Sequence, residues 1–311
     1  MYKNITTITK EEIKNLNISA QEKIEWINCV LRDKDNYILP TKTKIPLNES
    51  DYFNVMPCVL PPEDILGLKV VTRNAFRREH GMGNIEGDIL LYSYKDFEPK
   101  ALIDGGDITT IRTAAVAVHS MLNFAPKDIF NQNEKCKIAI IGLGKIGNEI
   151  GNILFDFLKD KPFIVKLYKY KNQAESFINR FKHFSNIEFT ICDTYEEVMK
   201  DSDVIFSAIT YTENDFCKPE IYKRKCTIIP VHLRGFKECD CTFDQIITSD
   251  LESIKKFENY SQIKKLLYID DIIKKDKHEF NGRTLIYNLG LAVYDLYFAN
   301  KIYNKIQNHE R

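Results

Sequence analysis

Three glycines near the middle of the chain have the spacing of a phosphate-binding turn. Gly142, Gly144 and Gly147 follow a short apolar run, typical of a buried strand, and precede an amphipathic helical pattern. In a strand–turn–helix unit, the first glycine permits the turn, the second lets a pyrophosphate approach the backbone and the third lets helix pack on strand. The helix N-terminus adds free N–H groups. The pattern predicts a dinucleotide site at these glycines and at Lys145 and Ile146 between them; the alternative is a glycine turn that binds nothing.

Two lysines stand where the next strand is expected to end. An NAD site commonly places an Asp or Glu about 20 residues beyond the glycines, on the ribose hydroxyl. The expected strand at 163–168 is followed instead by Lys169 and Lys171. A cation suits a 2′-phosphate, so the sequence favours NADP(H), with NAD(H) still possible. The alternative is that both lysines face solvent and selectivity is weak.

Bulk composition excludes several classes of protein. The 311 residues include 44 basic and 44 acidic side chains, so no nucleic-acid or anionic-membrane surface is expected from bulk charge. The N-terminus lacks the apolar core of a signal peptide, and no apolar run reaches about 18 residues. The eight cysteines are scattered, and Cys239 and Cys241 lack zinc-ligand spacing. We expect a cytoplasmic protein with reduced thiols and no metal site.

Hydrophobic periodicity predicts a largely β first part and a βαβ second part. In the first part, we expect an amphipathic helix over 13–30, with Ser19 after Ile18 as a possible cap of its second part. We also expect strands over 51–60 and 67–72, a hairpin of 88–94 with 100–104, and Asp107–Thr110 as caps of a helix over 111–122. In the second part, we expect strands at 163–168, 187–192, 203–209, 227–231 and 246–248, and helices at 173–184, 195–199, 251–267 and 270–277. A loop is expected from 282, followed by a final helix.

Five further segments flank the glycine turn in a fixed order. They are Met56–Pro57, Gly67–Val70, Ile108–Ala115, Asp203–Thr210 and Gly290–Asp295. Together with the turn they resemble the ornithine cyclodeaminase/mu-crystallin family of NAD(P)-dependent enzymes, from about Pro40 to Tyr303. The resemblance implies a homodimer that acts on amino acids or their cyclic imines. It also implies cofactor contacts from Thr113 and Thr210.

The resemblance implies that Lys69 and Arg112 hold the substrate carboxylate, with Lys42 as a third cation. A carboxylate removed from water needs cations, and Arg can bind it through two parallel hydrogen bonds. Partial burial of Lys69 would lower its pKa toward a proton-transfer role. The alternatives are a surface-exposed Lys69, an Arg112 that only pairs with Asp107, and Lys44 in place of Lys42.

One loop departs from the family pattern. Ornithine cyclodeaminases carry a catalytic Asp in a Gly-rich loop after the fifth strand of the nucleotide domain, and counting back from Glu238 places His232 at that position. His232 is a candidate acid/base that would titrate near its usual pKa of about 6.5, or a loop residue without a chemical role. Arg234 is a candidate contact for the substrate carboxylate or a cofactor phosphate, or a structural residue. The missing carboxylate disfavours cyclodeamination.

These observations predict an α/β protein in which a Rossmann dinucleotide-binding domain, residues 124–289, is inserted in a smaller α+β substrate and dimerisation domain. The smaller domain comprises residues 1–123 and the C-terminal helix 290–311. The expected reaction is hydride transfer between the nicotinamide and the α-carbon of an amino acid or its imine. The alternatives are an ornithine cyclodeaminase-type lyase that uses NAD catalytically, and a non-catalytic NADPH-binding protein.

Overall fold

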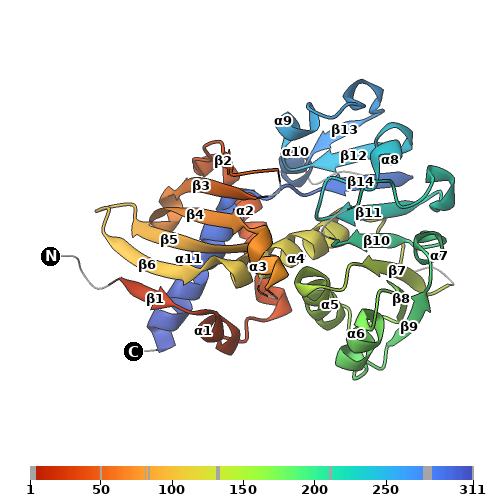
Figure 1. The fold of residues 1–311 in the computed structure, drawn as a ribbon, viewed down its shortest axis with the longest axis horizontal. Helices are drawn as coiled ribbons and strands as arrows, with labels where there is room; N and C mark the ends of the chain where they lie inside the picture. The colour runs from red at the N-terminus through yellow and green to blue at the C-terminus, as the bar shows by residue number, and fades with distance from the viewer. Residues whose placement is uncertain are drawn as a thin grey trace. The chain divides into compact units, whose positions relative to one another are not determined.

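A computed structural model of the chain describes residues 5–49, 51–80, 82, 85–130, 134–209, 212–275 and 282–309. Contacts divide the chain into two compact units: unit 1 comprises Met1–Arg112 and Gly290–Arg311, and unit 2 comprises Thr113–Leu289. Each unit contains one sheet (Figure 1), and the predicted α/β class is confirmed. The division lies inside one helix, α4 (Gly105–Phe124), whereas the boundary expected from the sequence follows residue 123.

Unit 1 is built on a six-stranded sheet in the order β1-β6-β5-β4-β3-β2. β1 is parallel to β6, and the other neighbours are antiparallel. The strands are β1 (Thr6–Ile8), β2 (Thr43–Pro46), β3 (Tyr52–Leu60), β4 (Ile65–Arg73), β5 (Ile85–Ser93) and β6 (Pro99–Asp104). The helices are α1 (Lys10–Asn15), α2 (Ala20–Asp33), α3 (Ala75–Glu79), the first part of α4, and α11 (Ala292–His309). Helix α11, blue in Figure 1, packs on β3, β4, β5 and α2.

The central strand β4 buries every second residue. Ile65, Lys69 and Val71 are buried, while Leu66 and Leu68 between them are half-buried. Successive side chains of a strand point to opposite faces. Lys69 therefore lies among the apolar residues of the buried face, where a lysine is unusual.

Unit 2 is an eight-stranded, wholly parallel sheet in the order β13-β12-β14-β11-β10-β7-β8-β9. The strands are β7 (Cys136–Ile141), β8 (Phe163–Tyr168), β9 (Ile187–Cys192), β10 (Val204–Ser207), β11 (Cys226–Pro230), β12 (Gln245–Thr248), β13 (Leu266–Tyr268) and β14 (Arg283–Tyr287). The helices are α5 (Lys145–Phe157), α6 (Gln173–Phe181), α7 (Tyr195–Met199), α8 (Lys237–Thr242), α9 (Leu251–Ile254) and α10 (Ile269–Lys275). Several strands are buried along their whole length, as expected for a parallel sheet covered on both faces.

The strand order of unit 2 reverses between β7 and β10. The chain proceeds from β7 through β8 to β9 on one side, and β10 and β11 follow on the other. Ligands of such sheets bind outside the carboxyl ends of the strands at this switch point. The backbone N–H of Ala208, after β10, donates to the carbonyl of Ile141 at the end of β7, with N and O 2.7 Å apart. The glycine turn therefore begins at the switch point.

Two helix boundaries differ from the expectation. The helix expected over 13–30 is interrupted, because Asn17 has φ 45°. The cap expected at Ser19 is confirmed: it forms a capping box with Glu22 that starts α2. Asp107–Thr110 do not precede the next helix but lie inside α4. The carboxylate of Asp104 accepts from the backbone N–H groups of residues 106 and 107, at 3.0 and 3.1 Å, and so caps the helix earlier.

Two elements of unit 2 were misassigned from the pattern. A helix over 251–267 is wrong: α9 has only four residues, and Leu266 pairs with Ile246 in the ladder of β13 and β12. The loop expected from 282 is also wrong, because β14 lies between β11 and β12. Both strands are short apolar runs whose identity depends on partners elsewhere in the chain, which periodicity alone does not reveal.

Candidate active site

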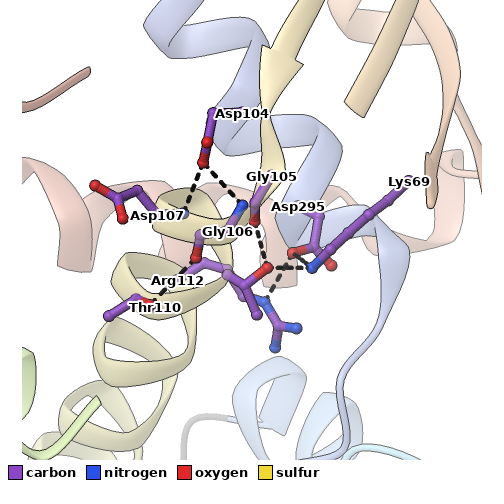
Figure 2. A network of polar contacts seen from close by, with 9 residues as sticks. Lys69, Asp104, Gly105, Gly106, Asp107, Thr110, Arg112 and Asp295 are labelled. Carbon is purple, nitrogen blue, oxygen red and sulfur yellow. Dashed lines mark hydrogen bonds and ion pairs between the residues drawn. The ribbon is translucent and has the colours of Figure 1, made fainter. Parts of the chain in front are cut away.

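Lys69 lies in the interior of unit 1 and is 1% exposed. Its Nζ is 2.7 Å from Oδ1 of Asp295 and 2.5 Å from Oγ1 of Thr109 (Figure 2). The Thr109 hydroxyl itself donates to the carbonyl of Gly105. An ammonium has three N–H groups, so one remains after these two contacts. Lys69 is thus a buried, partly satisfied donor and not a surface residue.

Arg112 binds the same carboxylate oxygen as Lys69. Its Nε is 2.9 Å from Oδ1 of Asp295, and its side chain is 11% exposed. Asp107, the alternative partner, instead pairs with Lys10 at 3.1 Å. Two cations therefore converge on one fully buried carboxylate, as Figure 2 shows, and the group as a whole is cationic.

Burial and charge act in opposite directions on the pKa of Lys69. Burial has the largest effect and lowers it; Asp295 raises it and Arg112 lowers it, giving a pKa of about 8. Burial would raise the pKa of Asp295, but Arg112 and Lys69 outweigh it and hold that pKa below its usual value. At pH 7 the cluster consists of two cations and one anion, and Lys69 titrates close to neutral pH.

Lys42 does not join this cluster. It is exposed and immediately precedes β2. No hydrogen bond or ion pair links it to Lys69, Arg112 or Asp295 within the described part of unit 1. Lys44, its alternative, lies over the ring of Tyr52, with Nζ 4.8 Å from the centroid.

The glycine turn of unit 2 leaves space where a pyrophosphate would lie. Gly142 has φ +86°, which suits glycine. A Cβ on Gly147 would be 2.1 Å from the carbonyl oxygen of Gly142, so helix and strand approach too closely for any other residue. A Cβ on Gly144 would meet nothing within 4 Å. The second glycine thus faces open space, as the prediction requires of the residue next to a phosphate.

The N-terminus of α5 is also available to an anion. Gly144 is the N-cap and offers no side-chain cap. Lys145 and Ile146 form the first turn, where backbone N–H groups have no intrahelical partner. Asn148 bonds through Nδ2 to the carbonyls of Leu143 and Gly144 and so holds the turn. These residues fit a dinucleotide pyrophosphate.

At the tip of β8, the two lysines have unequal surroundings. Nζ of Lys169 is 3.1 Å from Oδ1 of Asp193, and both side chains are exposed. Lys171 has φ 52° and lies over the ring of Tyr170, with Nζ 5.4 Å from the centroid. Part of the positive charge at this tip is therefore matched by a carboxylate that follows β9.

The two threonines named as cofactor contacts have different status. Thr113 is half-buried within α4 and is the first residue of unit 2. Thr210 lies outside the described residues.

His232 follows β11 and bonds to the end of β10. Its Nε2 is 2.7 Å from Oγ of Ser207, and the backbone N–H of Arg234 donates to Nδ1 at 3.4 Å. This accepting Nδ1 favours the tautomer with hydrogen on Nε2. Burial is the largest effect and lowers the pKa of His232 to about 4, so the expectation of titration near 6.5 is wrong. The Arg234 side chain is exposed.

Other kinds of site were sought across the described ranges. They contain no group of three or more His, Cys, Asp or Glu side chains arranged to hold a metal ion. Within the same ranges, no helix has both the length and the apolar character needed to span a membrane.

Comparison with known proteins identifies the family. The family model described as ornithine cyclodeaminase/mu-crystallin matches residues 5–225. The chain belongs to the ornithine cyclodeaminase/mu-crystallin family. The resemblance noted in the sequence is thereby confirmed.

Individual relatives and solved structures are also similar to the chain. It is 26% identical over 214 residues to a Δ1-pyrroline-2-carboxylate reductase of Bacillus cereus, covering 68% of this chain and 63% of that protein. The match thus spans less than two thirds of the relative. The fold is similar to that of the Thermococcus litoralis Δ1-pyrroline-2-carboxylate reductase in complex with NADH and L-proline (TM-score 0.81, 20% identity, 98% of both chains). It is also similar to an archaeal alanine dehydrogenase dimer with bound NAD (TM-score 0.81, 19% identity, 99% and 97% of the chains).

Two residues of the cluster were not named as site residues from the sequence. Asp295 belongs to the C-terminal segment that carries the family resemblance, and Thr109 to the segment before Arg112. The available signal was the acidic side chain of Asp295 within the apolar run 291–299, because buried carboxylates are rarely found without partners.

Proposed function

We propose that this protein is an NAD(P)H-dependent oxidoreductase that reduces a C=N bond adjacent to a carboxylate, yielding an amino acid. The observation that carries the proposal is the buried cluster of Lys69, Arg112 and Asp295, whose net positive charge suits a small carboxylate. The family, the pyrroline-carboxylate reductase relatives and the glycine turn support the same chemistry.

In this proposal Arg112 binds the substrate carboxylate. Its Nε is engaged by Asp295, which leaves the two Nη groups for a bidentate contact. Such a contact orients the substrate as well as binding it. Lys42 and Arg234 are also cations and are retained as candidate contacts for the substrate carboxylate. They are secondary to Arg112 because both are exposed and lie outside the cluster.

Lys69 is the proposed proton donor to the substrate nitrogen. Its pKa of about 8 keeps it mainly protonated at pH 7 while making proton release feasible. The N–H group that Asp295 and Thr109 leave unengaged is the one that would reach the nitrogen. His232 is the weaker candidate, because it is neutral at that pH and its Nε2 is bound to Ser207.

The proposed cofactor site is the turn at Gly142, Gly144 and Gly147 with Lys145 and Ile146, and the bound nicotinamide supplies the hydride. Thr113 and Thr210 remain proposed contacts. Lys169 and Lys171 favour NADP(H), with NAD(H) as the alternative, since Asp193 already neutralises part of the charge at Lys169. Measuring the KM for NADPH and for NADH tests this choice: preference for NADH by the wild type would contradict it.

We propose a division of labour in which residues 1–123 with the C-terminal helix 290–311 bind substrate and form the dimer, while 124–289 bind the cofactor. A homodimer is supported by an apolar row on the sheet of unit 1: Pro57, Leu68, Leu90 and Leu102 lie opposite one another on adjacent strands. None of the four is fully buried, and Leu102 is 40% exposed. Sedimentation of wild type and Leu68→Glu tests whether this face holds two copies together.

A cytoplasmic location is also proposed. All eight cysteines are free thiols, as is usual in a reducing compartment.

The proposed reaction is tested by following NAD(P)H absorbance with a panel of cyclic imines and of 2-oxo acids plus amines. Steady cofactor oxidation with an imine carboxylate is the expected result. Release of ammonia from ornithine without net cofactor change would instead indicate a lyase. Tight cofactor binding without turnover of any imine would indicate a non-catalytic binding protein.

A further inference from the structure

The C-terminal segment of unit 1 touches Arg112 at two places. Asp295, in the first turn of α11, accepts from Nε at 2.9 Å. Gly290 lies against the guanidinium: a Cβ there would be 3.2 Å from Nη2, 3.4 Å from Nη1 and 3.7 Å from Cζ. Because Cζ is farther from this Cβ than both Nη atoms are, the Cβ would lie beyond the Nη edge of the guanidinium and not over its flat face.

The two contacts concern different edges of the fork. The bond from Nε to Asp295 fixes rotation about the end of the side chain, because it determines which edge of the guanidinium faces the carboxylate. A side chain at position 290 would lie beyond the other edge, where the two Nη groups point. The absence of that side chain keeps a methyl group away from the edge that a bidentate carboxylate contact requires.

Asp295 also orients Lys69. The same Oδ1 atom lies 2.7 Å from Nζ, although the two residues are 226 positions apart in the sequence. Its second oxygen, Oδ2, is buried and has no hydrogen-bond partner among the described residues. Asp295 therefore commits one oxygen to both cations, which fixes the distance between them.

We propose that the segment Gly290–Asp295 is the positioning element of the carboxylate site: Asp295 holds Arg112 and Lys69 in register, and Gly290 keeps the Nη edge of Arg112 free of a side chain. Asp295 acts through the two cations, and Gly290 acts by lacking a side chain. This inference rests on the proposed carboxylate-binding role of Arg112.

The test uses binding of pyrrole-2-carboxylate, a planar carboxylate, measured by calorimetry on the full chain saturated with NADPH. Gly290→Ala adds one methyl group at 3.2 Å from Nη2, where it competes with the bound carboxylate, and should weaken binding by about tenfold or more, the usual cost of losing a hydrogen bond to a charged group. Gly106→Ala is the matched control, because its Cβ would also meet an atom at 3.2 Å, the Glu86 carboxylate, away from the fork. It should bind as wild type does.

A second variant separates positioning from packing. Affinity of the wild type should fall as pH rises through about 8, where Lys69 loses its proton. In Asp295→Asn this loss should move to lower pH, because the charge that raises the pKa of Lys69 is gone while Arg112 from α4 still lowers it. Thr109, which accepts from Lys69, and Cys58 of β3, whose pKa burial and the charge of Asp295 raise, carry no negative charge near neutral pH. A role in packing alone would leave the pH profile unchanged.

The outcomes distinguish this inference from the proposed reaction. The positioning role is overturned if Gly290→Ala binds pyrrole-2-carboxylate as tightly as the wild type does. It is also overturned if Gly106→Ala weakens binding as much as Gly290→Ala does. Both conclusions hold even if the wild type reduces imines. Weakened binding in Gly290→Ala with no imine turnover by the wild type supports the positioning role and refutes only the reaction. If the wild type does not bind the probe at all, the carboxylate site and its positioning element both fail.

Discussion

Lys69 in unit 1 is a buried nitrogen base and His232 in unit 2 a half-buried one, and burial lowers the pKa of each. They differ in their surroundings. Lys69 has the carboxylate of Asp295 at 2.7 Å, whereas His232 bonds to the hydroxyl of Ser207 and a backbone N–H. The pKa of Lys69 falls from 10.5 to about 8 and that of His232 from 6.5 to about 4, so the two decreases are alike although Lys69 is the more deeply buried.

The difference teaches how to choose a proton donor in this fold. Desolvation penalises both charges, and Asp295 limits the decrease for the more deeply buried Lys69. Because an amine starts from a higher pKa than an imidazole, Lys69 remains mainly protonated at pH 7 and His232 does not. His232, at the position that carries an Asp in ornithine cyclodeaminases, is neutral at pH 7. The proton donor that we propose, Lys69, belongs to unit 1.

The largest effect is expected from Lys69→Met, which keeps the length of the side chain and removes the ammonium. Loss of a general acid typically costs on the order of 10²–10⁴-fold in turnover, and we expect a loss in that range. In the wild type, kcat/KM should fall as pH rises through about 8, because the protonated form is the donor. Steady-state rates with an imine measure both the loss of turnover and its pH dependence. NADPH binding by the variant checks that it is folded. A variant that stays within threefold of wild type would remove Lys69 from the mechanism.

Arg112→Ala should weaken the substrate interaction by roughly 2–5 kcal/mol, the range for truncating one partner of a buried charge pair. The loss should appear in kcat/KM for the imine and not in NADPH affinity. Arg112→Lys should recover only part of it, since an ammonium cannot reproduce the planar fork. Full recovery would mean that charge alone is needed, and equal losses for imine and cofactor would place Arg112 in a purely structural role.

Asp240 extends the comparison to a buried acid, whose ionised form Tyr287 and the charge of Lys237 stabilise only in part. It is 4% exposed and accepts from the hydroxyl of Tyr287 at 2.9 Å. Burial raises its pKa to about 7 from 3.8. The folded state therefore holds a proton that the unfolded state releases between these values, and the free energy of unfolding should fall by up to about 4 kcal/mol as pH rises from about 4 to 7.

Urea denaturation of wild type and Asp240→Asn across this pH range measures that contribution. The variant should lose this part of the pH dependence, while the exposed Asp201→Asn should keep it. Parallel curves for wild type and Asp240→Asn would show that Asp240 is ionised in the folded protein well below pH 7.

The smallest effect is expected from His232→Gln. The amide N–H₂ can replace the Nε2–H donor toward Ser207, and no charge is lost at pH 7 because His232 is already neutral. Turnover should stay within about threefold of the wild type, and the pH profile should be unchanged. Removal of a group that acts as a general acid or base would slow turnover far more. Loss of a pH–rate inflection below pH 7 in this variant would restore His232 as an acid/base and break the contrast with Lys69.

Local pattern was sufficient for much of unit 2. The apolar run at 136–141, the glycine turn and α5 follow from residues adjacent in the chain, so the turn and its open space at Gly144 agree with expectation. β8 and β9 were also placed correctly: β8 is apolar apart from Lys166, and β9, the edge strand, alternates apolar and polar residues along most of its length. β13 and β14 were missed, because their strand character comes from β12 and β11 beside them.

The sequence by itself determined the family, the α/β class and the residue types of the site, since each is written in contiguous motifs. Only the tertiary structure decided which of these residues act together. Lys69, Arg112 and Asp295 come from β4, α4 and α11, and they meet because α11 packs on the buried face of the sheet. The same packing decides the charges, because a pKa depends on desolvation and on partners in space, neither of which is a property of neighbours along the chain.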